Sequence, residues 1–87
     1  MFNVIVTKKA MKGIEKMPHT IQLTMAHLIE DLIQNGPILR NWSNFSKIGI
    51  NQYHCHLAYK WVACWEYQKN TITIEVYYAG SRENAPY

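Results

Sequence analysis

The chain has 87 residues, of which 48% are hydrophobic and 13% aromatic, a composition that excludes an intrinsically disordered protein. Nine Lys and Arg against six Asp and Glu give a net charge of +3, which favours a polyanionic partner over a basic one. The excess is too small to indicate nucleic-acid binding by itself, and the length predicts one domain spanning residues 1–87.

Cysteine usage and the N-terminus bear on where the protein works. Two cysteines, Cys55 and Cys64, are too few for a disulfide framework and form no CxxC pair, so reduced thiols in a cytoplasmic protein are expected. The opening MFNVIVTKKAMKG lacks the basic n-region and long apolar h-region of a signal peptide. No apolar run approaches about eighteen residues, so we expect neither secretion nor membrane insertion.

The N-terminal half predicts a strand followed by two helices. The β-branched run FNVIVT at 2–7 is typical of a short strand, and Thr7 stands where a helix N-cap would be. Apolar residues at helical spacing predict a short helix over 8–17. A longer amphipathic helix is expected to start with Pro18 in its first turn and to stop before Gly36.

The C-terminal half changes from a helical period to an alternation of two. Residues 38–51 are polar and rich in turn formers, and they are interpreted as a connector. Strands are expected at 52–57, 61–67 and 71–79, with a polar tail from Gly80 that forms no further strand. The chain thus predicts an α+β fold, with a short N-terminal strand and two helices packed on one face of an antiparallel sheet that includes a three-stranded C-terminal meander.

The first meander segment, QYHCHL, raises the main functional question. Alternation along a strand places His54 and His56 on one face and the intervening apolar residues on the other, toward the helices. The imidazoles would then lie on the uncovered face. Their neighbours there, if the hairpin register is the expected one, would be Val62, Cys64 and Glu66.

Acid and base catalysis is one chemistry that fits this face. Histidine titrates near neutrality, so two imidazoles beside a phosphodiester can take a proton from a ribose 2′-OH and return one to the leaving 5′ oxygen. Such a site also needs a cation for the charge that builds on the phosphoryl oxygens. Candidates for that cation are Arg82, Lys60 and Lys47.

Other interpretations stay open. A His-x-His pair can bind a metal ion if Cys64 or Glu66 supplies a third ligand, and Cys64 could act as a nucleophile beside His54. Because no full ligand set can be placed and a cysteine within VACW is more often a packing residue, we expect no metal and no cofactor. The non-functional alternative is a pair of solvent-facing histidines on a half-exposed sheet.

The order of these elements, together with the motifs YHCHL, WVACWE and IEVYYAGSRENAPY, resembles the RelE/ParE superfamily of bacterial toxins over nearly the whole chain. The nearest resemblance is to RelE-like and HigB-like members. It implies a toxin of a type II toxin-antitoxin system, held inactive by a cognate antitoxin of helix-turn-helix type. It also implies a cytoplasmic endoribonuclease that cuts mRNA on the ribosome and inhibits translation.

The resemblance also implies site residues, position by position. The pair of basic residues on the first meander strand of relatives falls on His54 and His56, the arginine after the last strand on Arg82, and the tail aromatic on Tyr87. These four residues are therefore the expected catalytic set. The expected additional RNA contacts are Lys47 and Lys60.

One departure and one relative leave the function open. Val62 stands where many relatives carry an arginine, so one phosphate-binding charge is missing unless Lys60 replaces it. The same fold hosts ParE-type toxins, which inhibit DNA gyrase by binding and lack the catalytic set. Arg82, Tyr87 and the histidines favour the nuclease; the alternatives are a gyrase inhibitor or a non-catalytic RNA- or protein-binding module.

Overall fold

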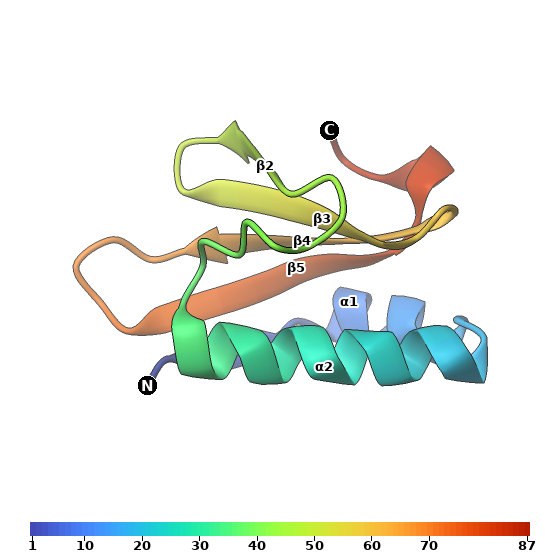
Figure 1. Ribbon diagram of the computed structural model, residues 1–87, viewed down its shortest axis with the longest axis horizontal. Helices are drawn as coiled ribbons and strands as arrows, with labels where there is room; N and C mark the ends of the chain where they lie inside the picture. Colours follow the sequence, from blue (N-terminus) through green and yellow to red (C-terminus); the bar gives the residue numbers. More distant parts are fainter.

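Seven helices and strands and a terminal 3₁₀ turn make up the chain in the computed structural model, which describes residues 1–87. The strands form a single five-stranded sheet in the order β1-β5-β4-β3-β2 (Figure 1). In chain order the elements are β1 (Asn3–Val6), α1 (Lys8–Glu15), α2 (His19–Asn35), β2 (Ser46–Gly49), β3 (Gln52–Ala58), β4 (Trp61–Tyr67), β5 (Thr73–Ser81) and η1 (Arg82–Asn84).

Both helices begin and end at the residues that the sequence predicts to within a turn. The Thr7 hydroxyl oxygen accepts a hydrogen bond of 3.1 Å from the Ala10 N–H, which caps α1. Pro18 directly precedes α2. Gly36 follows α2 with a φ of 86°, a conformation that favours glycine, and donates its N–H to the Leu32 carbonyl. Neither helix combines the length and apolarity needed to cross a membrane.

The sheet differs from the expectation in three places. β1 pairs in parallel with β5, so the sheet is mixed, while β2 to β5 pair antiparallel in sequence order. The interpretation of 38–51 as a connector is wrong at β2, where SKIG pairs with the outer edge of β3. Its Lys, Ser and Gly have little strand propensity of their own, so the pairing with β3 stabilises β2. β5 also continues to Ser81, past the expected end at residue 79.

The helices form one layer and the sheet the other (Figure 1). Trp65 of β4 is fully buried in the core between them, together with Leu28 and Leu32 of α2. α1 packs directly on β5 at Gly13, where an added Cβ would overlap the carbonyl oxygen of Ala79. The confirmed α+β arrangement leaves the opposite face of the sheet free of helices, and only the C-terminal tail folds back over it (Figure 1).

Candidate active site

Two histidines of β3 lie on the face of the sheet that the helices leave open. Across the β3–β4 ladder His54 pairs with Cys64 and His56 with Val62, and directly opposed residues of antiparallel strands share a face. The alternating apolar residues of β3 all belong to the core under the helices: Tyr53, Cys55 and Leu57. The alternation predicted for this strand is therefore confirmed.

The two imidazole rings are neighbours in an edge-to-face arrangement. Their centroids are 5.6 Å apart and their planes are inclined by 63°. His54 is only 7% exposed, whereas His56 is half-buried. The pair thus offers one enclosed ring and one accessible ring, with the spacing that a small group such as a phosphate needs to contact both.

Polar side chains from β2 and the loop before it hold both rings at the Nδ1 atom. Ser46 Oγ lies 3.0 Å from His54 Nδ1, and Asn44 Nδ2 lies 3.3 Å from His56 Nδ1. Asn44 has a φ of 54°, a left-handed conformation that asparagine tolerates better than most residues. Because both contacts use Nδ1, the Nε2 atom of each ring is left for a substrate.

The predicted site does not include Ser46 and Asn44. The sequence offers no signal for either residue beyond the short alternation of polar Ser46 and apolar Ile48. Their role depends on β2, which places Ser46 opposite His54 in the ladder. A one-residue change of register would move the hydroxyl to the other face. The positioning of the histidines is therefore a tertiary property of the β2–β3 pair.

The C-terminal tail brings Tyr87 onto the same face. Its ring lies over His54 with 4.3 Å between centroids and a tilt of 48° (the chain end is marked in Figure 1). Tyr87 remains 52% exposed, so it covers His54 without being enclosed itself. Burial raises the pKa of the Tyr87 hydroxyl above its usual range, and the positive charge of Arg82 partly opposes this change.

Burial also changes the protonation of His54. Its pKa is lowered from 6.5, first because the ring is desolvated and second because His56 lies beside it, while a hydrogen bond with the backbone of Ser46 acts in the opposite direction. At neutral pH His54 is therefore the uncharged imidazole. An uncharged imidazole is the form that accepts a proton, which is what a general base requires.

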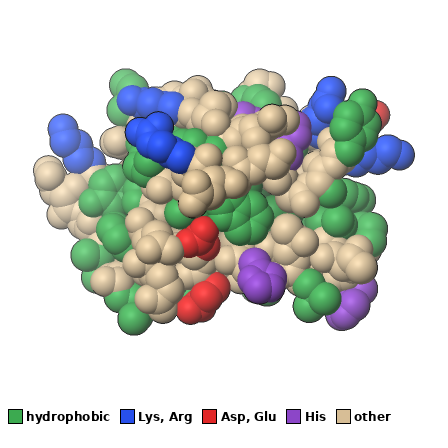
Figure 2. Space-filling model, in the orientation of Figure 1, with side chains coloured by type: hydrophobic (Ala, Val, Ile, Leu, Met, Phe, Trp, Pro, Cys, Tyr) green, Lys and Arg blue, Asp and Glu red, His purple; other side chains and the backbone are tan.

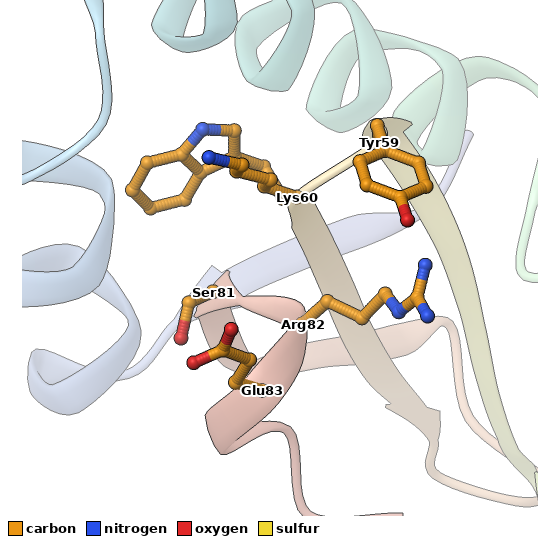
Figure 3. A pocket seen from close by; sticks show the side chains of 6 residues that line it. Tyr59, Lys60, Ser81, Arg82 and Glu83 are labelled. Atoms are coloured by element: carbon orange, nitrogen blue, oxygen red, sulfur yellow. The ribbon is translucent and has the colours of Figure 1, made fainter.

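Arg82 lies at the far end of β5, next to the β3–β4 turn. Its N–H donates to the Lys60 carbonyl at 2.7 Å, which ties the start of η1 to that turn. The guanidinium lies over the ring of Tyr59, with its central carbon 5.1 Å from the ring centroid. Figure 3 shows the Arg82 and Tyr59 side chains directed toward each other, whereas the Lys60 side chain is directed away from both.

The two lysines expected to contact RNA lie in different places. Lys60 is in the turn beside Arg82 and lines a pocket of about 290 Å³ with it. Lys47 pairs with Tyr53, so it lies on the helix side of the sheet and the structure does not bring it to the histidines. Figure 2 shows Lys and Arg side chains around the half of the molecule that carries the open face, with most of the visible acidic surface over the helical layer and some beside the basic side chains at the upper right.

The geometry supports neither a Cys64 nucleophile nor a metal site. Cys64 is fully buried, and burial raises the pKa of its thiol to about 12, so the reactive thiolate is not formed near neutral pH. Glu66 accepts a hydrogen bond of 3.0 Å from the Gln52 side-chain amide. No three His, Cys, Asp or Glu side chains come together in a way that could hold a metal ion.

Comparison with known structures gives the fold a name. The isolated RelE toxin of E. coli superposes with a TM-score of 0.75 at 11% identity, covering 99% of this chain and 89% of that one. The fold is that of the RelE and ParE toxins. A YoeB/ParE toxin from Agrobacterium tumefaciens gives a TM-score of 0.76 at 7% identity, over 93% of this chain and 99% of that one.

A chain of the archaeal RelE–RelB complex of Pyrococcus horikoshii OT3 has the same fold. It has a TM-score of 0.74 at 14% identity, with 97% of this chain and 98% of that one covered. No protein-family model matches the sequence, and no curated protein matches it significantly. The fold implied by the resemblance is thus confirmed, and because it is shared by RelE, YoeB and ParE, the activity has to be argued from the site.

Proposed function

We propose that the protein is the toxin of a type II toxin-antitoxin system and an endoribonuclease that cuts mRNA on the ribosome, in the cytoplasm. The observation that carries this proposal is the histidine pair, His54 and His56, on the open face of a RelE-like fold with both Nε2 atoms unengaged. The positive net charge of the chain supports a polyanionic substrate.

In the proposed reaction His54 is the general base. With its Nδ1–H donated to the Ser46 hydroxyl oxygen, Nε2 of His54 holds a lone pair that takes the proton of a ribose 2′-OH. The 2′ oxygen then bonds to the adjacent phosphorus as the bond from phosphorus to the 5′ oxygen breaks. His56 in its protonated form gives a proton to that leaving oxygen, so the products are a 2′,3′-cyclic phosphate and a 5′-hydroxyl.

Arg82 and Tyr87 complete the proposed site. The guanidinium of Arg82 stabilises the negative charge on the phosphoryl oxygens in the transition state, and its charge already acts on Tyr87, whose pKa it lowers against the larger effect of burial. Tyr87 orients the substrate or stacks on a base once it has moved off His54. Lys60, in the turn beside Arg82, contributes to RNA binding through its charge.

The proposed protein partner is a cognate antitoxin of helix-turn-helix type. RelE is recorded in complex with RelB among the structural relatives, which supports a partner of this kind. An acidic or amphipathic segment of such a protein would cover the open face, near which Figure 2 shows several Lys and Arg side chains, and hide the histidine pair. Co-purification of the toxin with the product of an adjacent small gene would test this assembly.

Transcript mapping tests the nuclease activity. Wild type and a His54→Ala/His56→Ala variant are induced separately, and the 5′ ends of cellular transcripts are mapped by primer extension. The matched control is His19→Ala/His27→Ala, which removes two histidines of α2 and leaves the open face intact. New 5′ ends are expected with wild type and with the control but not with the first variant. Growth arrest by all three without new ends would rule the nuclease out.

A gyrase inhibitor is the second candidate, because a YoeB/ParE toxin superposes on the chain as well as RelE does. Inhibition by binding needs no acid and base pair, so the His54→Ala/His56→Ala variant would keep its effect. Purified protein would then block DNA supercoiling in vitro while cellular mRNA stays intact. The nuclease proposal expects unaffected supercoiling.

A further inference from the structure

A pocket beside the candidate active site is formed by the β3–β4 turn and the end of β5. It has a volume of about 290 Å³, close to the lower limit of small-molecule sites. Figure 3 shows its lining side chains grouped around an open centre. The residues are Tyr59, Lys60, Trp61, Ser81, Arg82 and Glu83.

The aromatic side chains of this turn pocket are placed for contact with a flat ligand. Tyr59 is 76% exposed although it is a large aromatic residue, and Trp61 lines the same pocket while it is only partly buried. The Arg82 guanidinium lies over the Tyr59 ring. Single-stranded RNA is bound by surfaces of this composition, in which unpaired bases stack on tyrosine, tryptophan or arginine planes.

Glu83 distinguishes this pocket from a phosphate site. A carboxylate next to Lys60 and Arg82 repels a phosphate, but it accepts hydrogen bonds from the donor groups of a base edge. Guanine carries two adjacent donors, N1–H and N2–H, which match the two oxygens of one carboxylate. Adenine and cytosine each offer a single exocyclic amino group, and uracil a single ring N–H.

We propose that the turn pocket binds one unpaired guanine base of an RNA strand, stacked on Tyr59 and held through Glu83. Tyr59 and Glu83 both line the pocket, and the guanidinium of Arg82, which lies over the Tyr59 ring, moves aside when the base stacks there. Use of this pocket in choosing the cleavage position rests on the proposed nuclease function, whereas base binding itself does not.

Nucleotide binding is measured directly, without any cleavage. Wild-type protein from cell-free synthesis is labelled with ¹⁵N, and the Trp61 indole cross-peak is followed during titration with GMP, AMP, CMP and UMP. GMP is expected to bind roughly tenfold more tightly than the other three nucleotides. Equal affinities for all four, or no shift of the Trp61 peak at about 10 mM nucleotide, would overturn the proposal.

Three variants test the separate roles in the pocket. Glu83→Gln should bring GMP binding to within about twofold of the others, because an amide replaces one acceptor oxygen by a donor. Tyr59→Leu should lower the binding affinity for all four nucleotides by roughly fivefold or more. Glu75→Gln, on β5 outside the pocket, removes the same charge and should change nothing. If Tyr59→Leu binds GMP as tightly as wild type, Tyr59 is surface packing and the proposal is wrong.

The double variant His54→Ala/His56→Ala separates this inference from the proposed function. It should bind GMP like wild type and produce no cleavage. Transcript cleavage by wild type without GMP binding would refute the guanine pocket and leave the nuclease in place. GMP binding without cleavage would refute the nuclease and leave the pocket.

Discussion

The ring of Tyr87 lies over the imidazole of His54, with 4.3 Å between the two centroids. The end of the chain thereby contacts strand β3, and His54 is only 7% exposed. The substrate of the proposed reaction needs the Nε2 atom of this ring, so the tail has to shift when RNA binds. The tail therefore influences both the protonation of His54 and access to it.

Replacing Tyr87 by alanine should raise the pKa of His54. Desolvation is the largest cause of its lowered pKa, and removal of the covering ring admits water, so the pKa should move up toward 6.5. A ¹H–¹³C NMR titration of the His54 ring measures this change. Tyr59→Ala, which removes an aromatic ring that does not contact His54, serves as the control. An unchanged or lower pKa would contradict the covering role.

The stability of the protein should decrease as the pH falls below about 6.5. The unfolded chain takes up a proton on His54 at the ordinary pKa of 6.5, whereas the folded protein does so only at lower pH. Between these two pKa values the unfolded state binds more protons than the folded state, so the free energy of unfolding falls as the pH is lowered. Above pH 6.5 both states are neutral at this residue, so its contribution to the pH dependence vanishes.

Urea denaturation from about pH 5 to pH 8 measures this dependence. His54→Gln should show a shallower loss of the free energy of unfolding toward low pH than wild type. His19→Gln, an exposed position at the start of α2, should keep the wild-type profile. Parallel profiles for wild type and His54→Gln would show that His54 does not contribute.

Replacing Ser46 by alanine should remove the preferred protonation of His54 at Nδ1. The proposed base role needs the tautomer that donates Nδ1–H to the hydroxyl oxygen across the 3.0 Å contact, and ¹⁵N shifts of the ring nitrogens report which atom holds the proton. Loss of one neutral hydrogen bond should also lower the free energy of unfolding by about 1 kcal/mol. Ser46→Thr keeps a hydroxyl and should restore the tautomer. A wild-type tautomer in Ser46→Ala would contradict this role.

The face assignment of β3 could be predicted because it depends on the alternation of its own residues. Tyr53 and Cys55 are apolar or weakly polar neighbours of two histidines, and burying them fixes the orientation of His54 and His56. The same reasoning places Val62 on the open face, where it pairs with His56. These features follow from local pattern and are therefore readable in the sequence.

The surroundings of the histidines could not be predicted, because tertiary contacts determine them. Ser46 reaches His54 only through the pairing of β2 with β3, and β2 has no strand pattern of its own. Tyr87 reaches the same ring because η1 turns the chain back after β5. Lys47 shows the converse, since its charge suggested RNA contact while the register places it on the other face.

Gly13→Ala should destabilise the protein although the position is helical. Alanine in place of glycine ordinarily stabilises a helix by about 0.5–1 kcal/mol, and the sequence alone suggests that Gly13 weakens α1. Here an added Cβ would overlap the Ala79 carbonyl oxygen, so α1 would have to move off β5, at a cost of about 2 kcal/mol. Thermal unfolding measures the change, with Lys12→Ala on the exposed side of α1 as control. Equal or higher stability of Gly13→Ala would contradict this packing.

The two cysteines should be unreactive in the folded protein. Both are fully buried, and burial raises the pKa of each thiol to about 12, so about one thiol in ten thousand is ionised near pH 8. Ellman's reagent should therefore react slowly with native protein and with two thiols per chain once denaturant is added, which is the internal control. Cys64→Ala should still cut mRNA, because the proposed chemistry uses the imidazoles and no thiolate. Rapid reaction of one native thiol, together with loss of cleavage in Cys64→Ala, would instead identify Cys64 as a nucleophile activated by its neighbour His54.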